Sequence, residues 1–228
     1  MVLVHGLGMS SRYMTPLAEH LSPNFRVYAP DLPGFGLSSK PSHALTVPEL
    51  AEALAAFVSA MNIPRAAFIA NSLGCEVLVE LALRYPERVE RLVLQGPTPD
   101  PRDRSAVQTV AFFAITCLFE RWSLGWIALT DYLRCGKARY FATFRDMVGH
   151  LIEPKLPLVK APTLIVWGTR DYIVPRRSVE RYARLLPSGS LAIVPGAAHG
   201  MNYSNPELLR NSVFGFLLGS STSLAEPS

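Results

Sequence analysis

Ala66-Ala67-Phe68-Ile69-Ala70-Asn71-Ser72-Leu73-Gly74-Cys75 is an apolar segment that ends in a short polar turn. Residues 66–70 are predicted to form a strand, and a helix is predicted from Glu76 onward, because its apolar residues recur at helical spacing. Small residues, Ala70 and Gly74, stand two positions before and after Ser72, where larger side chains would collide as strand and helix converge. The usual Gly-x-Ser-x-Gly pattern therefore has Ala70 in place of its first glycine. The turn predicts that Ser72 is a candidate nucleophile.

Two further segments each place a polar side chain just beyond an apolar strand. They are Thr163-Leu164-Ile165-Val166-Trp167-Gly168-Thr169-Arg170-Asp171 and Leu191-Ala192-Ile193-Val194-Pro195-Gly196-Ala197-Ala198-His199. A serine hydroxyl is a poor nucleophile at neutral pH and needs a general base, which in turn needs a group that orients it. Ligands of parallel sheets bind at the carboxyl ends of the strands. We therefore expect Ser72, Asp171 and His199 to meet at one edge of a sheet.

The other histidines fit the role of general base less well. His20 is expected at the end of a surface helix, His43 in a loop, and His150 at the end of a polar stretch, and none of them follows a strand. His5 does follow a strand, but we expect it to bond the loop backbone and shape the turn. Asp31 is likewise expected to have a structural role in an Asp-Leu-Pro-Gly turn. Asp171 and His199 remain the preferred pair.

The order Ser72, Asp171, His199 along the chain is the order found in α/β-hydrolases. Two glycine-rich turns also resemble those of that family, namely Val2-Leu3-Val4-His5-Gly6-Leu7-Gly8 and Asp31-Leu32-Pro33-Gly34-Phe35-Gly36. The chain resembles the cap-bearing α/β-hydrolases, a group that includes esterases, C–C bond hydrolases, haloperoxidases and epoxide hydrolases. The resemblance runs over residues 2–217 and is weakest over residues 98–156.

The resemblance implies an α/β fold, with a mostly parallel, doubly wound sheet and a small helical cap. Residues 1–97 and 155–218 would form the hydrolase core. Ser72, Asp171 and His199 would be the catalytic residues. The backbone N–H groups of Leu7 and Leu73 would form an oxyanion hole, which stabilises the negative charge that collects on the carbonyl oxygen during acyl transfer.

Residues 98–154 form a predicted insertion that is rich in aromatic residues and reads as helices without strands. Such a cap would exclude water and line an apolar pocket above the serine. The residues that we expect to line this pocket are Phe112, Trp122, Trp126 and Met201. Residues 219–228 have almost no apolar content and are predicted to be a disordered tail.

The amino terminus suggests an incomplete sheet. Members of the resembled family usually carry two strands before the one that ends in His-Gly, and this chain begins at that strand. We expect the strand predicted at residues 26–29 to have an unpaired edge, which could pair with a second subunit and form a homodimer. If upstream sequence encodes two more strands in frame, the natural protein is longer than this chain.

Composition is that of an ordinary globular domain. The chain has 228 residues, of which 49% are hydrophobic and 18% charged, and its formal net charge is +4. Basic residues are scattered, so nucleic-acid binding is not expected. Three cysteines show no metal-ligand spacing, and no dinucleotide-binding loop is present, so no metal or cofactor is predicted. No signal peptide or membrane span is recognised, which predicts a cytoplasmic protein. The predicted partner is a small-molecule substrate.

The residue type at the position of the nucleophile limits which class of reaction the protein can catalyse. Epoxide hydrolases and haloalkane dehalogenases of the resembled group use an aspartate at this turn, so Ser72 favours acyl transfer to water. The function we predict is hydrolysis of carboxylic esters of small to medium apolar substrates through an acyl-serine intermediate. One alternative is a C–C bond hydrolase of aromatic meta-cleavage products, which would need a cap arginine for the substrate carboxylate, with the candidates Arg121, Arg134, Arg139 and Arg145. Another alternative is a non-catalytic ligand-binding protein on the same fold.

Overall fold

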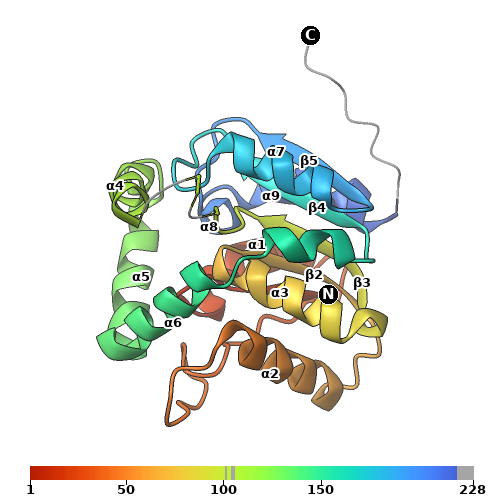
Figure 1. Ribbon diagram of the computed structural model, residues 1–228, viewed down its shortest axis with the longest axis horizontal. Coiled ribbons are helices and arrows are strands. Elements are labelled where there is room, and N and C mark those ends of the chain that lie inside the picture. The colour runs from red at the N-terminus through yellow and green to blue at the C-terminus, as the bar shows by residue number, and fades with distance from the viewer. Residues whose placement is uncertain (101, 104–105, 220–228) are drawn as a thin grey trace.

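A five-stranded parallel sheet forms the centre of the molecule (Figure 1). The computed structural model describes residues 1–100, 102–103 and 106–219. Neighbouring strands are all parallel and lie in chain order: β1 Val2–Val4, β2 Ala66–Asn71, β3 Val89–Gln95, β4 Thr163–Gly168 and β5 Gly189–Val194. The predicted α/β class with a mostly parallel sheet is confirmed.

Alternate side chains of the strands enter two separate apolar cores. Val2 and Val4 of β1 belong to one core, whereas Leu3 belongs to the other. In β2, Phe68 and Ile69 divide in the same way. Strands that are buried on both faces read as continuous hydrophobic runs rather than as alternating ones. This burial accounts for the uninterrupted apolar segments of the sequence.

Helices cover both faces of the sheet. Helices α2, α3 and α7 pack in the core on one face, and α1 and α9 pack in the core on the other. Thr46 and Glu49 form a capping box at the start of α2, with the Thr46 N–H donating to Glu49 Oε2 at 2.7 Å. The bounds of the covering helices are α1 Thr15–Leu21, α2 Val47–Ala60, α3 Leu73–Arg84, α7 Arg176–Leu185 and α9 Pro206–Leu217.

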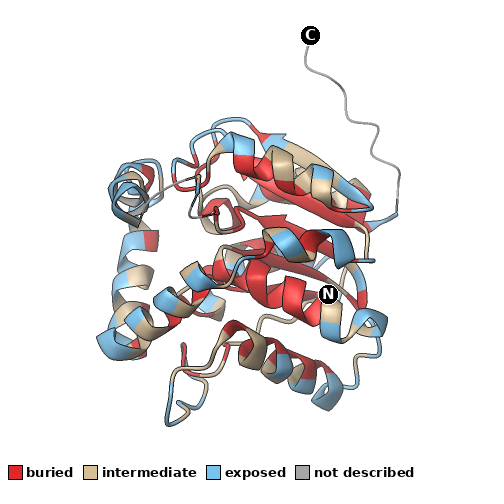
Figure 2. Ribbon diagram, in the orientation of Figure 1, coloured by how far each residue is buried: buried red, intermediate tan, exposed pale blue. Residues whose placement is uncertain are grey.

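Three helices between β3 and β4 form a group apart from the sheet, at the left of Figure 1. Figure 2 shows that they are mostly exposed or half-buried, whereas α3 is mostly buried. These helices, which we call the insertion helices, are α4 Ala106–Cys117, α5 Trp122–Cys135 and α6 Lys137–Gly149. The remaining short elements are α8 Met201–Ser204 and the 3₁₀ turns Ser11–Tyr13, Pro86–Arg88 and Glu153–Leu158.

The strand predicted at residues 26–29 is reduced to a single bridge, so that prediction was wrong. Tyr28 pairs with Val2, donating to Met1 O at 3.0 Å and accepting from Leu3 N at 2.8 Å. β1 offers only three residues for pairing, and Pro30 lacks the N–H that a longer ladder would need. The homodimer predicted through this edge stays a prediction.

Two further expectations concern helices and the carboxyl terminus. None of the helices in the described residues is both long and apolar enough to cross a membrane. The predicted disordered tail at residues 219–228 lies, apart from Gly219, outside the described residues.

Candidate active site

Ser72 occupies a strained turn between β2 and α3. Its backbone angles are φ 53° and ψ −125°, a combination that costs a residue other than glycine roughly 1–3 kcal/mol. Its N–H donates to Gln95 O at 3.1 Å, which fixes the turn to the end of β3. A side chain at Gly74 would place its Cβ 2.8 Å from Val4 O and 3.0 Å from Ala70 Cβ. The small residues around Ser72 are therefore required by the close approach of α3 to the sheet.

Asp171 and His199 form a hydrogen-bonded pair at the ends of β4 and β5. His199 Nδ1 lies 2.8 Å from Asp171 Oδ2, and the Asp171 side chain is fully buried. The other carboxylate oxygen, Oδ1, accepts the backbone N–H groups of Ile173 at 3.0 Å and Val174 at 3.1 Å. With one oxygen held by the backbone, the second is directed at the imidazole. Nδ1 then carries the proton, and Nε2 is left with a lone pair.

The electrostatic surroundings of His199 favour its protonated form. Burial by itself lowers the pKa of His199, but the charge of Asp171 and its hydrogen bond, together with the charge of Glu120, outweigh burial and leave the pKa raised above 6.5. An imidazole with these neighbours can accept a proton and hold it as an ion pair with Asp171. This is the property that a general base next to a serine requires.

Two buried amide side chains, Asn71 and Gln95, hold the backbone of His199, and a third, Asn202, supports Gln95. Gln95 Nε2 donates to His199 O at 2.7 Å, and Asn71 Nδ2 donates to the same oxygen at 3.0 Å. Gln95 Nε2 also donates to Asn202 Oδ1 at 3.0 Å, and Asn202 Nδ2 donates to Tyr13 O at 2.9 Å. Sequence reasoning missed this network. The signal that could have found it is a polar residue at the last position of an apolar strand, which occurs at both Asn71 and Gln95.

The loop after β1 lies beside Ser72 and is shaped by His5. The His5 ring contacts Gly6 O through Nδ1 at 2.9 Å and accepts Leu32 N through Nε2 at 3.0 Å. Burial lowers the pKa of His5, so the ring is neutral. Gly6 and Leu7 line the cavity next to Ser72. Leu73 is the first residue of α3, so its N–H has no partner inside the helix.

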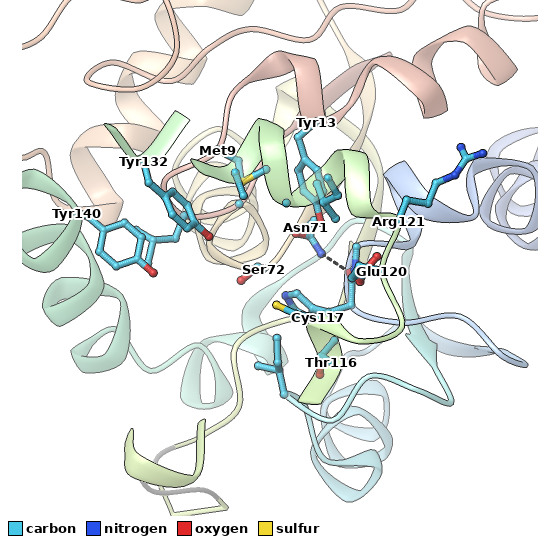
Figure 3. Close-up of a pocket in the computed structure, with 18 of the residues that line it drawn as sticks. Met9, Tyr13, Asn71, Ser72, Thr116, Cys117, Glu120, Arg121, Tyr132 and Tyr140 are labelled. Atoms are coloured by element: carbon cyan, nitrogen blue, oxygen red, sulfur yellow. Dashed lines mark hydrogen bonds between the residues drawn. The ribbon is translucent and has the colours of Figure 1, made fainter. Parts of the chain in front are cut away.

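An apolar cavity of about 240 Å³ opens above Ser72, and the insertion helices supply much of its wall (Figure 3). Of the residues expected to line it, Trp122 does so, with a side chain that is mostly exposed at the rim. Phe112, Trp126 and Met201 do not line it. Trp126 is 66% exposed on the outer surface of α5, whereas Met201 is fully buried. Helical spacing did not reveal which face of each insertion helix turns toward the serine.

Sequence reasoning also missed three polar residues of the cavity wall, Glu120, Tyr132 and Tyr140. Glu120 Oε1 accepts the N–H of Gly200 at 2.6 Å, directly after His199, and its other oxygen accepts Ser204 Oγ. A polar contact between α5 and the core joins Ser10 Oγ, which donates, to Asp131 Oδ2 at 2.6 Å. Nothing in the local sequence around Glu120 indicates that it reaches the loop of His199.

Comparison with known proteins places this geometry in a family. A family model described as "alpha/beta hydrolase fold" matches residues 1–151, more than half of the chain. The protein named "Putative carbamate hydrolase RutD" of Yersinia enterocolitica is 29% identical, over 95% of this chain and 86% of that protein. The 2-hydroxy-6-oxo-6-phenylhexa-2,4-dienoate hydrolase of Burkholderia cepacia is 24% identical, over 95% and 86% respectively.

Among solved structures, the fold is similar to that of a membrane phospholipase A, which is described as a bacterial virulence factor. The TM-score is 0.80 at 28% identity, and the match covers 96% of this chain and 78% of that one. The chain is therefore a hydrolase that belongs to the α/β-hydrolase fold family.

Proposed function

We propose that this hydrolase cleaves carboxylic esters with small to medium apolar groups through an acyl-serine intermediate. The single observation that carries the proposal is the 2.8 Å contact of Asp171 with His199, at the cavity in which the strained Ser72 also lies. Ser72, Asp171 and His199 are the proposed catalytic residues.

In the first half of the proposed reaction, His199 Nε2 takes the proton of Ser72 Oγ as that oxygen attacks the acyl carbon. Asp171 stabilises the imidazolium that results. The tetrahedral intermediate collapses when His199 returns the proton to the leaving alcohol, which leaves an acyl-serine ester. In the second half, His199 takes a proton from water, the hydroxide attacks the acyl carbon, and Ser72 is released with its proton restored.

The proposed oxyanion hole consists of the N–H groups of Leu7 and Leu73. Each donor aimed at the developing oxyanion contributes roughly 3–4 kcal/mol to the stability of the transition state. The helix start at Leu73 also adds a favourable dipole for negative charge. Hydrogen bonds of His5 to the loop backbone would hold Leu7 in position.

The insertion helices are the proposed lid of the site. Their apolar wall would exclude water from the acyl-serine during its formation and strengthen the charge interactions around His199. An apolar wall also favours apolar acyl or alcohol groups over charged ones. Residues 98–154 would thus form a cap on a core of residues 1–97 and 155–218.

A second candidate function is C–C bond hydrolysis of an aromatic ring-cleavage product. The observation that favours it is the similarity to the Burkholderia cepacia dienoate hydrolase. Carbamate hydrolysis, the activity in the name of the Yersinia enterocolitica relative, would use the same acyl-serine step. These reactions differ in the substrate and not in the proposed nucleophile.

Hydrolysis of p-nitrophenyl esters from acetate to dodecanoate, with a p-nitrophenyl carbamate and a ring-cleavage dienoate in parallel, tests the proposal. We expect the best turnover on short to medium esters and a loss of roughly 10⁴-fold or more in Ser72→Ala. Ser212→Ala, which removes a hydroxyl bonded only within α9, is the matched control and should retain full activity. Turnover of the dienoate alone, or of the carbamate alone, would reassign the substrate. Ester turnover that survives Ser72→Ala in folded protein would overturn the mechanism.

A further inference from the structure

The charged side chains on the cavity wall bear on which substrates can bind, a question that the proposed reaction leaves open. Among the described residues that line the cavity, Glu120 and Arg121 are the only Asp, Glu, Lys or Arg side chains. Figure 3 shows the Arg121 side chain pointing away from Ser72, and this residue is exposed. The acidic or basic side chain of the wall that contacts the residue after the base is a carboxylate, Glu120.

Glu120 is fixed in this position by two hydrogen bonds. Its Oε1 accepts Gly200 N at 2.6 Å and its Oε2 accepts Ser204 Oγ. Its charge contributes to the raised pKa of His199, so its field reaches the reacting groups. A carboxylate on the substrate would lose its water in an apolar cavity, lie near Glu120 and meet no inward-pointing Lys or Arg side chain among the described residues of the wall. Each of these effects opposes binding of an anion.

Tyr132 and Tyr140 supply a polar patch on the opposite part of the wall. Their ring centroids lie 5.1 Å apart, and Figure 3 shows both hydroxyls turned toward the part of the cavity in which Ser72 lies. Burial raises the pKa of both phenols, so they stay protonated. Each phenol carries one proton, so each O–H can donate a hydrogen bond to a ligand in the cavity.

The two rings also lie next to the proposed oxyanion hole. A side chain at Gly8 would place its Cβ 2.5 Å from Tyr132 Cε1 and 3.0 Å from Tyr140 Cδ2, so the rings pack on the residue that follows Leu7. The carbonyl oxygen of a bound acyl group would face Leu7 N. An oxygen a few bonds further along the acyl chain is therefore within reach of the tyrosine pair.

We propose that the site selects neutral acyl groups that carry a second hydrogen-bond acceptor, such as a carbonyl or ether oxygen, and excludes acyl groups that carry a carboxylate. Tyr132 and Tyr140 bind the second acceptor, and Glu120 repels the anion. This assignment rests on the proposed ester hydrolysis, and it separates this chain from hydrolases whose substrates bear a carboxylate.

Three p-nitrophenyl esters with acyl chains of similar length test the assignment: the hexanoate, the monomethyl glutarate and the glutarate half-acid. One additional hydrogen bond predicts that kcat/KM for the methyl glutarate exceeds that for the hexanoate by about 3-fold to 10-fold. Because the carboxylate of the half-acid must lose its water in the cavity, we expect its kcat/KM to be at least ~30-fold below that of its methyl ester. Tyr140→Phe is expected to bring the ratio of methyl glutarate to hexanoate down to about 1, and Glu120→Gln to raise turnover of the half-acid relative to its methyl ester.

Tyr28→Phe, at the residue that forms a bridge with Val2 of β1, is the matched control and should leave all three values unchanged. Half-acid turnover within threefold of the methyl ester, or an unchanged ratio in Tyr140→Phe, would overturn the assignment while Ser72-dependent hexanoate hydrolysis still supports the esterase. If folded protein hydrolyses none of the three esters, the esterase proposal fails and the assignment fails with it.

Discussion

Replacement of Gly96 by alanine tests how tightly the Asp171 and His199 pair is confined. Gly96 follows β3 directly and has a φ of +54°, which glycine adopts without strain. A Cβ at this position would lie 2.9 Å from both Cε1 and Nδ1 of His199 and 3.0 Å from Asp171 Oδ2. The new methyl group therefore meets the hydrogen-bonded pair at its centre.

The size of the effect follows from these distances. Ordinary contact begins at 3.4 Å, so the imidazole must retreat by about 0.5 Å from the 2.9 Å position. Since a misplacement of about 1 Å can cost roughly 10²-fold in rate, Gly96→Ala should lower kcat by about 10-fold to 100-fold. The left-handed backbone adds a cost of about 1–2 kcal/mol in the free energy of unfolding.

A second variant, Gly136→Ala, distinguishes the effect of backbone strain from that of the steric collision with His199. Gly136 has a φ of +82°, and a Cβ added there would meet no atom within 4 Å, so its replacement brings backbone strain alone. Ester hydrolysis and urea unfolding of both variants are the measurements. We expect both proteins to lose stability, with a further loss in Gly96→Ala from the collision, and we expect a loss of kcat in Gly96→Ala alone. Activity of Gly96→Ala within threefold of the parent, or an equal loss of kcat in Gly136→Ala, would refute the reasoning.

The remaining predictions concern charge and access. A protonated His199 cannot act as a base, so kcat/KM should rise with pH through a midpoint above 6.5. Glu120→Gln removes a charge that raises the pKa of His199, so it should move that midpoint to lower pH. A midpoint that stays or rises in this variant contradicts the role of Glu120. Burial raises the pKa of Glu76 well above 4.5, so the native protein keeps a proton that the unfolded chain releases, and stability should fall as the pH rises above 4.5, by up to about 1.4 kcal/mol per pH unit. Urea unfolding at pH 5 and pH 8 should show a smaller difference in Glu76→Gln than in the parent, and equal differences would contradict that burial effect. Cys117 is exposed and lines the cavity, so alkylation by iodoacetamide should lower ester turnover at least about tenfold by blocking access. Cys117→Ser should keep its activity in the presence of the reagent. Equal inactivation of both proteins would show that alkylation of another residue causes the loss.

The convergence of Ser72, Asp171 and His199 could be predicted because it depends on backbone topology. Each side chain follows a strand, and parallel strands bring their carboxyl ends to one edge of the sheet. The apolar runs before these residues are long enough to be recognised without knowledge of their partners. The short loop between Val194 and His199 likewise keeps the imidazole at that edge.

The wall of the cavity could not be predicted in the same way. The insertion helices are apolar on more than one face, so their spacing does not tell which side chains turn inward. Trp126 lies on the outer surface, whereas Tyr132, further along the same helix, lines the cavity. The contact of Glu120 with Gly200 joins residues 80 positions apart, and a single sequence holds no local signal for it.

The position of the proposed base depends on both the rigid sheet and the insertion helices. Asn71 and Gln95 reach His199 O from the ends of β2 and β3, so two strands that are buried on both faces fix its backbone. Glu120 binds the next residue, Gly200, from the segment between α4 and α5. Any movement of that segment that admits substrate must carry Glu120 away from Gly200 or pull the loop with it. The segment between α4 and α5 is therefore joined to the backbone beside the imidazole by the hydrogen bonds of Glu120 to Gly200 and Ser204, while the amides of Asn71 and Gln95 limit how far the base can move.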